Sequence, residues 1–177
     1  MLTQYEKDLK IKHAYNVYLY VFDQYKKDPN VYWSRLLECS VNEAGIHGTK
    51  TGMVSIEALE SKIKKAKKQF VSNLDNVSLE HPITYKVIAL HTLNRKSPMN
   101  KEEYVNLWQD NLITTIVTSK QNKALIKFQK DFQFGVDCWK KMYKRAGINL
   151  VEDVDLRNDY VREKYGLPQI QRGRKRK

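Results

Sequence analysis

Apolar residues in the first part of the chain recur at steps of three and four, the spacing that places side chains on one face of an α-helix. The first such stripe consists of Ile11, Tyr15, Tyr18, Phe22 and Tyr25. It predicts a helix over residues 2–27, which ends before Asp28-Pro29-Asn30. A second helix is predicted over residues 31–44, and Gly45 stands where helices often close in the left-handed conformation.

The same spacing predicts further helices along the rest of the chain. They are expected over residues 56–73, over residues 79–93, from Asn100 to about Ile116, over residues 120–146, and between Asp155 and Gly166. Ser55 suits the cap of the first of these, and Asn100 with Glu103 resembles a capping box.

Three segments interrupt this pattern. Residues 46–54 contain two glycines and are predicted to form a loop. The β-branched run 113–118 has a weaker helical preference than its neighbours. Residues 148–154 suit a short strand, but the sequence offers it no obvious partner strand.

Glycine (7) and proline (4) are scarce over 177 residues, and this composition favours long helices over a β-sandwich with many turns. The predicted fold is therefore all-α, an irregular bundle of about six or seven helices. It forms one domain over residues 1–166, and residues 167–177 follow as an extended basic tail.

Targeting signals and disulfides are not expected. The N-terminus carries acidic residues early and has no apolar core, and no apolar run approaches the ~20 residues that span a bilayer. Cys39 and Cys138 fall within predicted helices and are expected to be buried apolar residues rather than a disulfide. We expect a soluble protein of the cytoplasm of a host cell, or of a virion, without a membrane partner.

The formal net charge is +12, from 32 basic and 20 acidic residues. The end of the chain contributes five cations and no acid, which leaves +7 for the rest. The tail cations are Arg172, Arg174, Lys175, Arg176 and Lys177. Such a surplus attracts polyanions, namely nucleic acid or an acidic protein surface.

A second cluster of cations lies on the helix predicted over residues 56–73. It consists of Lys62, Lys64, Lys65, Lys67 and Lys68. These lysines are candidates for phosphate contacts, although they would also suit the solvated face of an amphipathic helix. A helix-turn-helix is disfavoured because about ten residues separate this helix from the preceding one, whereas that motif uses a turn of three or four.

No catalytic, metal or cofactor motif is present. A phosphate-binding loop needs glycine directly before its lysine and again five positions earlier, but Thr49 and Ala44 stand there before Lys50. The histidines have no one-turn spacing that would let two of them share a metal ion. They are His13, His47, His81 and His91. We expect no enzyme, although scattered carboxylates leave a magnesium site open.

A basic helical body of this size, rich in tyrosine and ending in a short arm, is similar in general shape to head-to-tail connector proteins and small terminase subunits of tailed phages. The preferred hypothesis is a non-enzymatic, homo-oligomeric subunit of a large nucleoprotein assembly, whose tail docks on a neighbouring subunit or on nucleic acid. The alternative is a protein that binds DNA or RNA directly, as a packaging factor or regulator. A ring or higher oligomer would favour the first, and salt-dependent binding to bare duplex the second.

Overall fold

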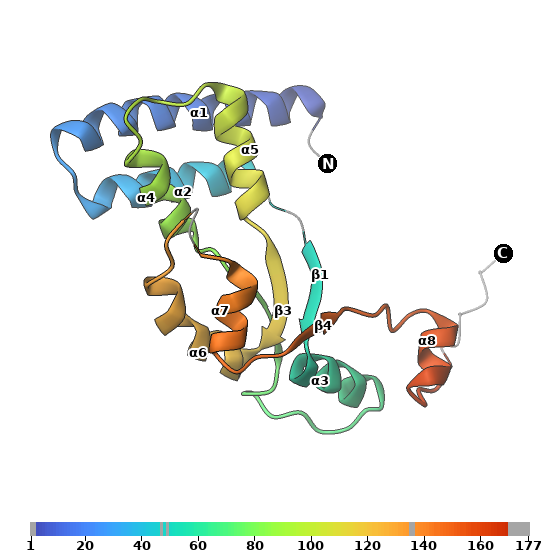
Figure 1. Ribbon diagram of the computed structural model, residues 1–177. Helices are drawn as coiled ribbons and strands as arrows, with labels where there is room; N and C mark the ends of the chain where they lie inside the picture. Colours follow the sequence, from blue (N-terminus) through green and yellow to red (C-terminus); the bar gives the residue numbers. More distant parts are fainter. Residues whose placement is uncertain (1–2, 47, 49, 135–136, 170–177) are drawn as a thin grey trace.

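The computed structural model describes residues 3–46, 48, 50–134 and 137–169, and these form eight helices and a four-stranded sheet (Figure 1). The elements in chain order are α1 (Gln4–Lys27), α2 (Val31–Ala44), β1 (Lys50–Ser55), α3 (Ile56–Ala66), β2 (Val77–Glu80), α4 (Tyr85–Leu93), α5 (Lys101–Asn111), β3 (Thr114–Thr118), α6 (Ser119–Lys130), α7 (Trp139–Arg145), β4 (Leu150–Glu152) and α8 (Asp159–Lys164). The all-α prediction is wrong, because the fold is mixed α and β.

The sheet has the strand order β2-β3-β1-β4. β1 and β3 run parallel, and β2 and β4 pair antiparallel to β3 and β1 respectively. Val54 of β1 lies opposite Ile116 of β3 on one side and Val151 of β4 on the other. Residues far apart in the sequence therefore meet in the two central strands.

Three of the four strands fall where the sequence pattern predicted a loop or a helix, and the fourth falls where a strand without a partner was considered. β1 occupies most of the predicted loop 46–54, β2 begins before the helix predicted over residues 79–93, and β3 is the β-branched run. β4 lies in the segment that seemed to lack a partner, and its partner is β1. The strands have three to six residues, too few for a clear alternating pattern, and they are stabilised by pairing with distant segments.

The helices α1, α2, α4 and α5 form a layer at one end of the sheet (Figure 1). The predicted helices over residues 2–27 and 31–44 are confirmed, and Gly45 closes α2 with a φ of 66°. The rings of Tyr18 and Tyr104 stack with centroids 4.7 Å apart, and the Tyr18 hydroxyl accepts a hydrogen bond from the Met99 amide. This aromatic core holds the layer together.

A second hydrophobic cluster lies between the sheet and the pair α6 and α7. It consists of Val117, Leu125, Met142, Tyr143 and Ile148. Phe132 and Trp139, which lie at the two ends of the connection between α6 and α7, pack against both clusters. The single helix predicted over residues 120–146 is therefore two helices, α6 and α7. Phe132 and Trp139, near the break between them, pack against the core of the helical layer.

Two other sequence expectations need correction. α3 ends at Ala66, not at residue 73, and its buried residues are Ala58 and Ser61 rather than the predicted stripe of larger side chains. Cys39 and Cys138 are both exposed. Cys39 lies on α2 away from its buried face, and Cys138 stands at the cap position before α7.

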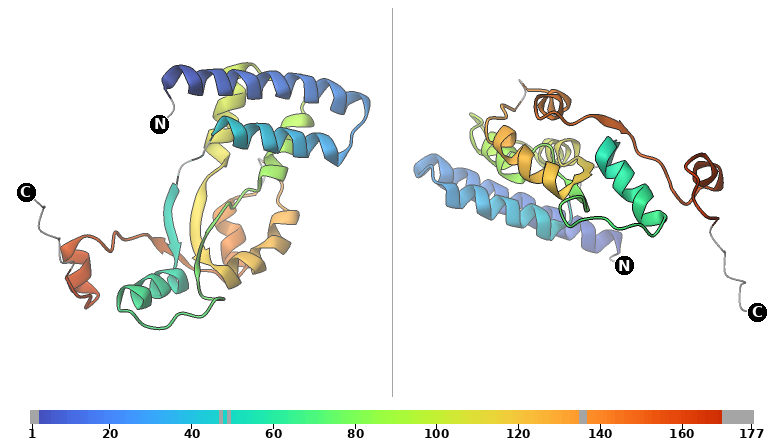
Figure 2. Two further views of the ribbon diagram at one scale, coloured as in Figure 1. Left: turned by 180° about the vertical axis from the view of Figure 1, so that it is seen from behind. Right: turned by 90° about the horizontal axis from the view of Figure 1, so that it is seen from below.

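The chain beyond β4 forms a C-terminal arm, which we define as residues 153–169. Figures 1 and 2 show that α8 stands apart from the body, on the other side of β3 and β1 from α6 and α7. The helix predicted between Asp155 and Gly166 is present in this arm as α8. Gly166, just after this helix, has a φ of 59°. Of the predicted tail 167–177, residues 170–177 lie outside the described residues.

Candidate nucleic-acid interface

The α3 lysines do not form one free cationic face. Lys62 makes an ion pair with Asp153, and both side chains are only about a quarter exposed, at 23% and 26%. The other four lysines are exposed near the carboxyl end of α3, where the helix dipole favours cations. Glu57 and Glu60 lie on the same short helix. One of the five lysines is therefore engaged within the fold, and the other four share a short segment with two acidic residues.

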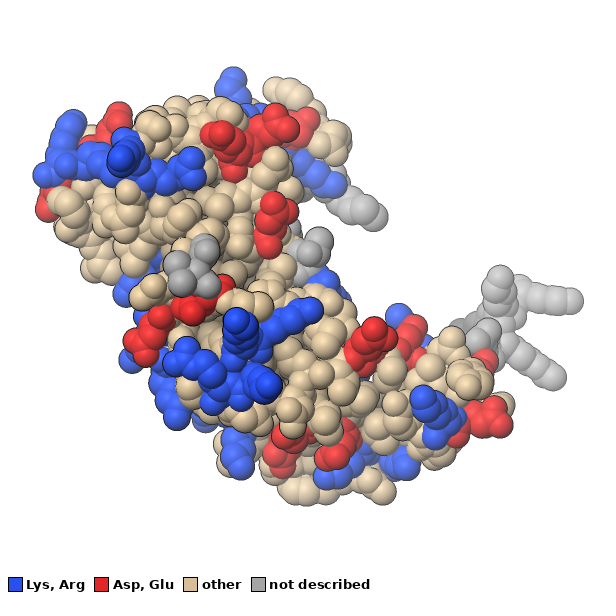
Figure 3. Space-filling view, in the orientation of Figure 1, with Lys and Arg blue, Asp and Glu red and all other residues tan. Residues whose placement is uncertain are grey.

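A larger group of cations lies on α6 and α7. We call it the α6–α7 basic surface, and it consists of Lys120, Lys123, Lys127, Lys130, Lys140, Lys141, Lys144 and Arg145. All eight are exposed, and none forms an ion pair with another described residue. Figure 3 shows blue side chains gathered over α6 and α7, while the region of α3 has red and blue mixed.

Helical geometry explains why these cations share a surface. Those of α6 follow one another at steps of three, four and three, so they line one face of the helix. On α7, Met142 and Tyr143 face the core, and the four cations cover the opposite side. Because apolar residues fix the inner face of each helix, the lysines must point outward.

A narrow groove between the two helices joins the two cationic faces. We call it the α6–α7 groove; its cavity volume is about 100 Å³, and it is lined by Phe128, Phe132, Asp137, Cys138, Lys141, Met142 and Arg145. The Phe128 ring lies under Lys127 Nζ, 4.9 Å from the ring centroid, and under Arg145 Cζ, 5.9 Å from it. Cations of both helices therefore converge over one aromatic ring.

One carboxylate also lies in the groove. Asp137 accepts a hydrogen bond from the Gln133 amide at 2.7 Å, which closes the end of the connection between α6 and α7. Its charge is outweighed, because residues 119–145 carry eight basic residues and only two acidic ones. This segment therefore supplies +6 of the net +12, and the segment 56–68 supplies only +3.

A buried polar network fastens the basic surface to the sheet. Glu80, at the end of β2, is 3% exposed and bonds with the Tyr143 hydroxyl of α7 and with Gln129 Nε2 of α6. Gln129 Nε2 also donates to the carbonyl oxygen of His81 at 2.9 Å. Burial raises the pKa of Glu80 to about 7, although its two hydrogen-bond partners oppose this shift.

Hydroxyl groups extend the network across the sheet. Tyr143 also hydrogen-bonds with Thr115, whose hydroxyl lies 3.1 Å from that of Thr51, and Thr51 donates to the Thr114 carbonyl. The Tyr143 hydroxyl donates to the Glu80 carboxyl, and Thr51 donates to the Thr114 carbonyl, so these buried polar groups are paired, which suits a structural role.

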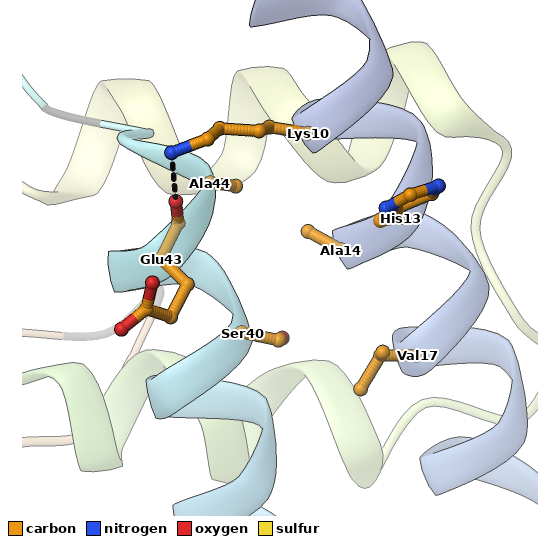
Figure 4. Close-up of a pocket in the computed structure, with 7 residues that line it drawn as sticks. All are labelled: Lys10, His13, Ala14, Val17, Ser40, Glu43 and Ala44. Carbon is orange, nitrogen blue, oxygen red and sulfur yellow. Dashed lines mark hydrogen bonds between the residues drawn. The ribbon is translucent and has the colours of Figure 1, made fainter. Parts of the chain in front are cut away.

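The helical layer has a pocket of about 250 Å³ between α1 and α2 (Figure 4). Lys10 reaches across from α1 to the carbonyl of Glu43, with Nζ and oxygen 3.4 Å apart, and the Glu43 carboxylate turns away from α1. The Ser40 hydroxyl donates to the Leu37 carbonyl of its own helix. Because Ala14 and Ala44 lie between these polar groups, the pocket offers a ligand few fixed partners.

The part of the chain that the structure describes contains neither a cluster of metal-ligating side chains nor a membrane-spanning helix. Within it, no three His, Cys, Asp or Glu side chains gather closely enough to hold a metal ion. None of its helices has the length and apolar character needed to cross a bilayer. His47 and the five tail cations lie outside the described residues.

Sequence reasoning missed the α6–α7 basic surface. It treated residues 120–146 as one helix and considered only the apolar face, although the segment 119–145 carries a basic excess of +6. A running count of charge would have found it. Comparison of the chain with protein-family models, with curated proteins and with solved structures gives no match.

Proposed function

We propose that this protein binds nucleic acid through the α6–α7 basic surface, by contacts to phosphates and without strong sequence preference. The observation that carries the proposal is the group of eight exposed cations that make no ion pair with a described residue. Polyanions with closely spaced charges, such as duplex DNA or RNA, complement such a group.

The types of side chain support non-specific binding. Seven of the eight cations are lysines, which contact phosphates as point charges and read bases poorly. Arg145 is the exception, and its guanidinium lies over Phe128 at the groove, where a bidentate contact to one phosphate is sterically reasonable. This role requires no catalytic group.

The test compares two triple variants of equal net charge. The groove variant is Lys127→Gln, Lys141→Gln and Arg145→Gln, and the matched control is Lys64→Gln, Lys65→Gln and Lys67→Gln on α3. Affinity for a fluorescent DNA duplex and for an RNA duplex of the same length is measured by anisotropy at several salt concentrations.

We expect the groove variant to weaken binding at least about tenfold and to lower the salt slope by roughly two to three units, because up to three phosphate contacts are lost. The α3 control should weaken binding less than about threefold, since its lysines act only through long-range charge. Equal effects of the two variants would mean that binding depends on net charge alone and that the proposed interface is wrong. Failure of the unmodified chain to bind either duplex would remove the proposal altogether.

A second candidate function is that of a subunit in a nucleoprotein assembly, the preferred hypothesis from the sequence. The arm favours it, because α8 projects from the body and Tyr160 on it is 76% exposed. Sedimentation of the full chain, compared with a chain that ends at Gln169, tests this function. A ring or higher oligomer that is lost on truncation, while helicity is unchanged, would support it, whereas a monomer at high concentration would contradict it.

A further inference from the structure

An apolar groove lies between α4 and α6, where the helical layer meets the pair α6 and α7 (Figure 1). We call it the α4–α6 groove; its cavity volume is about 320 Å³, against about 100 Å³ for the α6–α7 groove. Its floor is formed by Val87 and Leu90, one turn apart on α4, and by Ile126 of α6. Ile126 is 51% exposed and the other two are half-buried, so the floor offers a partner a continuous apolar surface.

The polar side chains that line the groove are engaged within the fold. The Thr84 hydroxyl accepts a hydrogen bond from the Val87 amide at 3.3 Å and so caps α4. Gln129 Nε2 donates to the carbonyl oxygen of His81 at 2.9 Å and also bonds with Glu80. Because His81 lies just before α4, this bond fixes the spacing of the two walls. The groove is therefore preformed, and it offers a small polar ligand few fixed partners.

The charges at the rim of the groove have one sign. Lys86 of α4 and Lys130 of α6 are exposed, and neither forms an ion pair with another described residue. Lys123 stands one turn before Ile126 on α6 and adds a third cation beside the floor. Neither α4 nor α6 contains an acidic residue, and the first carboxylate after α6 is that of Asp131. A partner therefore meets cations on both walls of an apolar floor.

This combination of floor and rim selects the chemistry of the partner. A nucleic-acid backbone would pair with the lysines, but its polar and hydrated surface does not complement an apolar floor. A neutral apolar segment would fill the floor and leave the lysines without partners. An amphipathic helix with apolar side chains at every third or fourth position, and acidic residues beside them, complements both.

We propose that the α4–α6 groove binds an acidic amphipathic helix of a partner protein. Apolar side chains of that helix pack on Val87, Leu90 and Ile126, and its carboxylates pair with Lys86 and Lys130. The site goes beyond the proposed function and does not depend on it, since the groove shares only Lys130 with the α6–α7 basic surface.

The experiment measures by anisotropy how the full chain binds three synthetic fluorescent peptides of equal length. The first is a helical peptide with leucine at every third or fourth position and glutamate at most of the others. The second has lysine in place of each glutamate, and the third has serine in place of each leucine. The three peptides separate the contribution of the apolar floor from that of the charged rim.

Two variants of the protein locate the site. Ile126→Gln removes the centre of the floor, and glutamine favours a helix at least as well as isoleucine, so α6 is retained. Lys86→Gln with Lys130→Gln removes the rim charges. The matched controls are Phe70→Gln, at a side chain that is 88% exposed, and Lys64→Gln with Lys65→Gln on α3.

We expect the unmodified chain to bind the glutamate peptide at least about tenfold more tightly than either of the other two peptides. Ile126→Gln should weaken this binding about tenfold, because an apolar contact is lost. The rim variant should weaken it about fivefold at low salt and less at high salt, since its charges are exposed. Both controls should stay within about twofold of the unmodified chain.

The proposal is overturned if the glutamate peptide does not bind, or if the lysine or serine peptide binds as tightly. Peptide affinity that Ile126→Gln leaves unchanged would also overturn it, because binding would then lie elsewhere.

Two further measurements on Ile126→Gln address the other occupants of the groove. Its affinity for a DNA duplex should stay within about twofold of that of the unmodified chain. A fall as large as the fall in peptide affinity would assign the groove to nucleic acid and overturn the proposal. Sedimentation that shows an oligomer of the unmodified chain, lost in this variant, would assign the groove to a second copy and also overturn it. Duplex binding by the unmodified chain reports on the proposed function alone, so the two proposals fail independently.

Discussion

Two lysine-rich regions of this protein, α3 and the pair α6 and α7, differ in what lies around their cations. On α3, Lys62 is paired with Asp153, and the remaining four lysines are exposed at the carboxyl end of the helix, whose first turns carry Glu57 and Glu60. On α6 and α7, eight cations point outward with two acidic residues in the whole segment. The number of exposed cations without an ion pair, eight on α6 and α7 against four on α3, therefore distinguishes the proposed binding surface from the α3 cluster.

The two regions also differ in how they are anchored. α3 buries only Ala58 and Ser61 deeply, whereas α6 and α7 are anchored by Leu125, Met142 and Tyr143 and by the bonds to Glu80. Larger buried side chains contribute more free energy. The basic surface therefore sits on the more firmly packed of the two regions, which keeps its cations in fixed relative positions.

The largest effect is expected from Leu125→Ala. Leu125 lies on the inner face of α6 and is fully buried. Its truncation should lower the free energy of unfolding by about 3 kcal/mol, within the usual range for the cavity that such a substitution leaves. Ile63→Ala on α3, where the side chain is only partly buried, should cost about 1 kcal/mol. Urea denaturation of both variants measures the difference, and equal losses would contradict the contrast in anchoring.

The next effect concerns pH. The folded protein holds the Glu80 proton more tightly than an unfolded chain, since its pKa is raised from 4.5 to about 7. The folded state therefore binds more protons between these values, and stability falls as the pH rises from about 4.5 to about 7, by on the order of 3 kcal/mol. The contribution of Glu80 to the free energy of unfolding is fully present below pH 4.5 and is lost above about pH 7.

Glu80→Gln tests this assignment, because the amide stays neutral and still offers an oxygen to Tyr143. Denaturation midpoints of the variant should vary less between pH 4.5 and pH 7 than those of the unmodified chain. Glu60→Gln on α3, an exposed position, should leave the pH dependence unchanged. A variant at Glu80 with the original pH profile would show that another group titrates.

The smallest effect is expected from Lys62→Gln, which removes the ion pair with Asp153. Since both side chains are partly exposed, the loss in stability should be about 0.5 to 1 kcal/mol. Duplex affinity should change by less than about twofold, because this lysine is not available to phosphates. A loss of affinity as large as that of the groove variant would restore α3 as part of the interface.

Much of the helical layer could be predicted from the sequence, although α4 begins at Tyr85 rather than at residue 79 and α5 ends at Asn111 rather than near Ile116. The bounds of α2, the end of α1, the closing Gly45 and the capping box of Asn100 and Glu103 all agree with the structure. These features depend on residues close together in the chain. The sheet could not be predicted in this way, because β1 needs both Thr114–Thr118 and Leu150–Glu152 beside it before its residues are better placed in a strand than in a loop.

The candidate site shows the same division. Tail and α3 lysines drew attention because they are adjacent in the sequence, whereas Lys127 and Arg145 are 18 positions apart and meet only over the Phe128 ring. Glu80 gave no signal at all in the sequence, since its burial arises from packing against α6 and α7.

The sequence by itself determined the net charge, the amphipathic helices and their caps, because each depends on composition or on side chains within one or two turns. Only the tertiary structure decided which cations are free, which strands pair and which carboxyl is buried. Those outcomes depend on contacts between distant segments, whose free energy is gained only after the chain has brought them together.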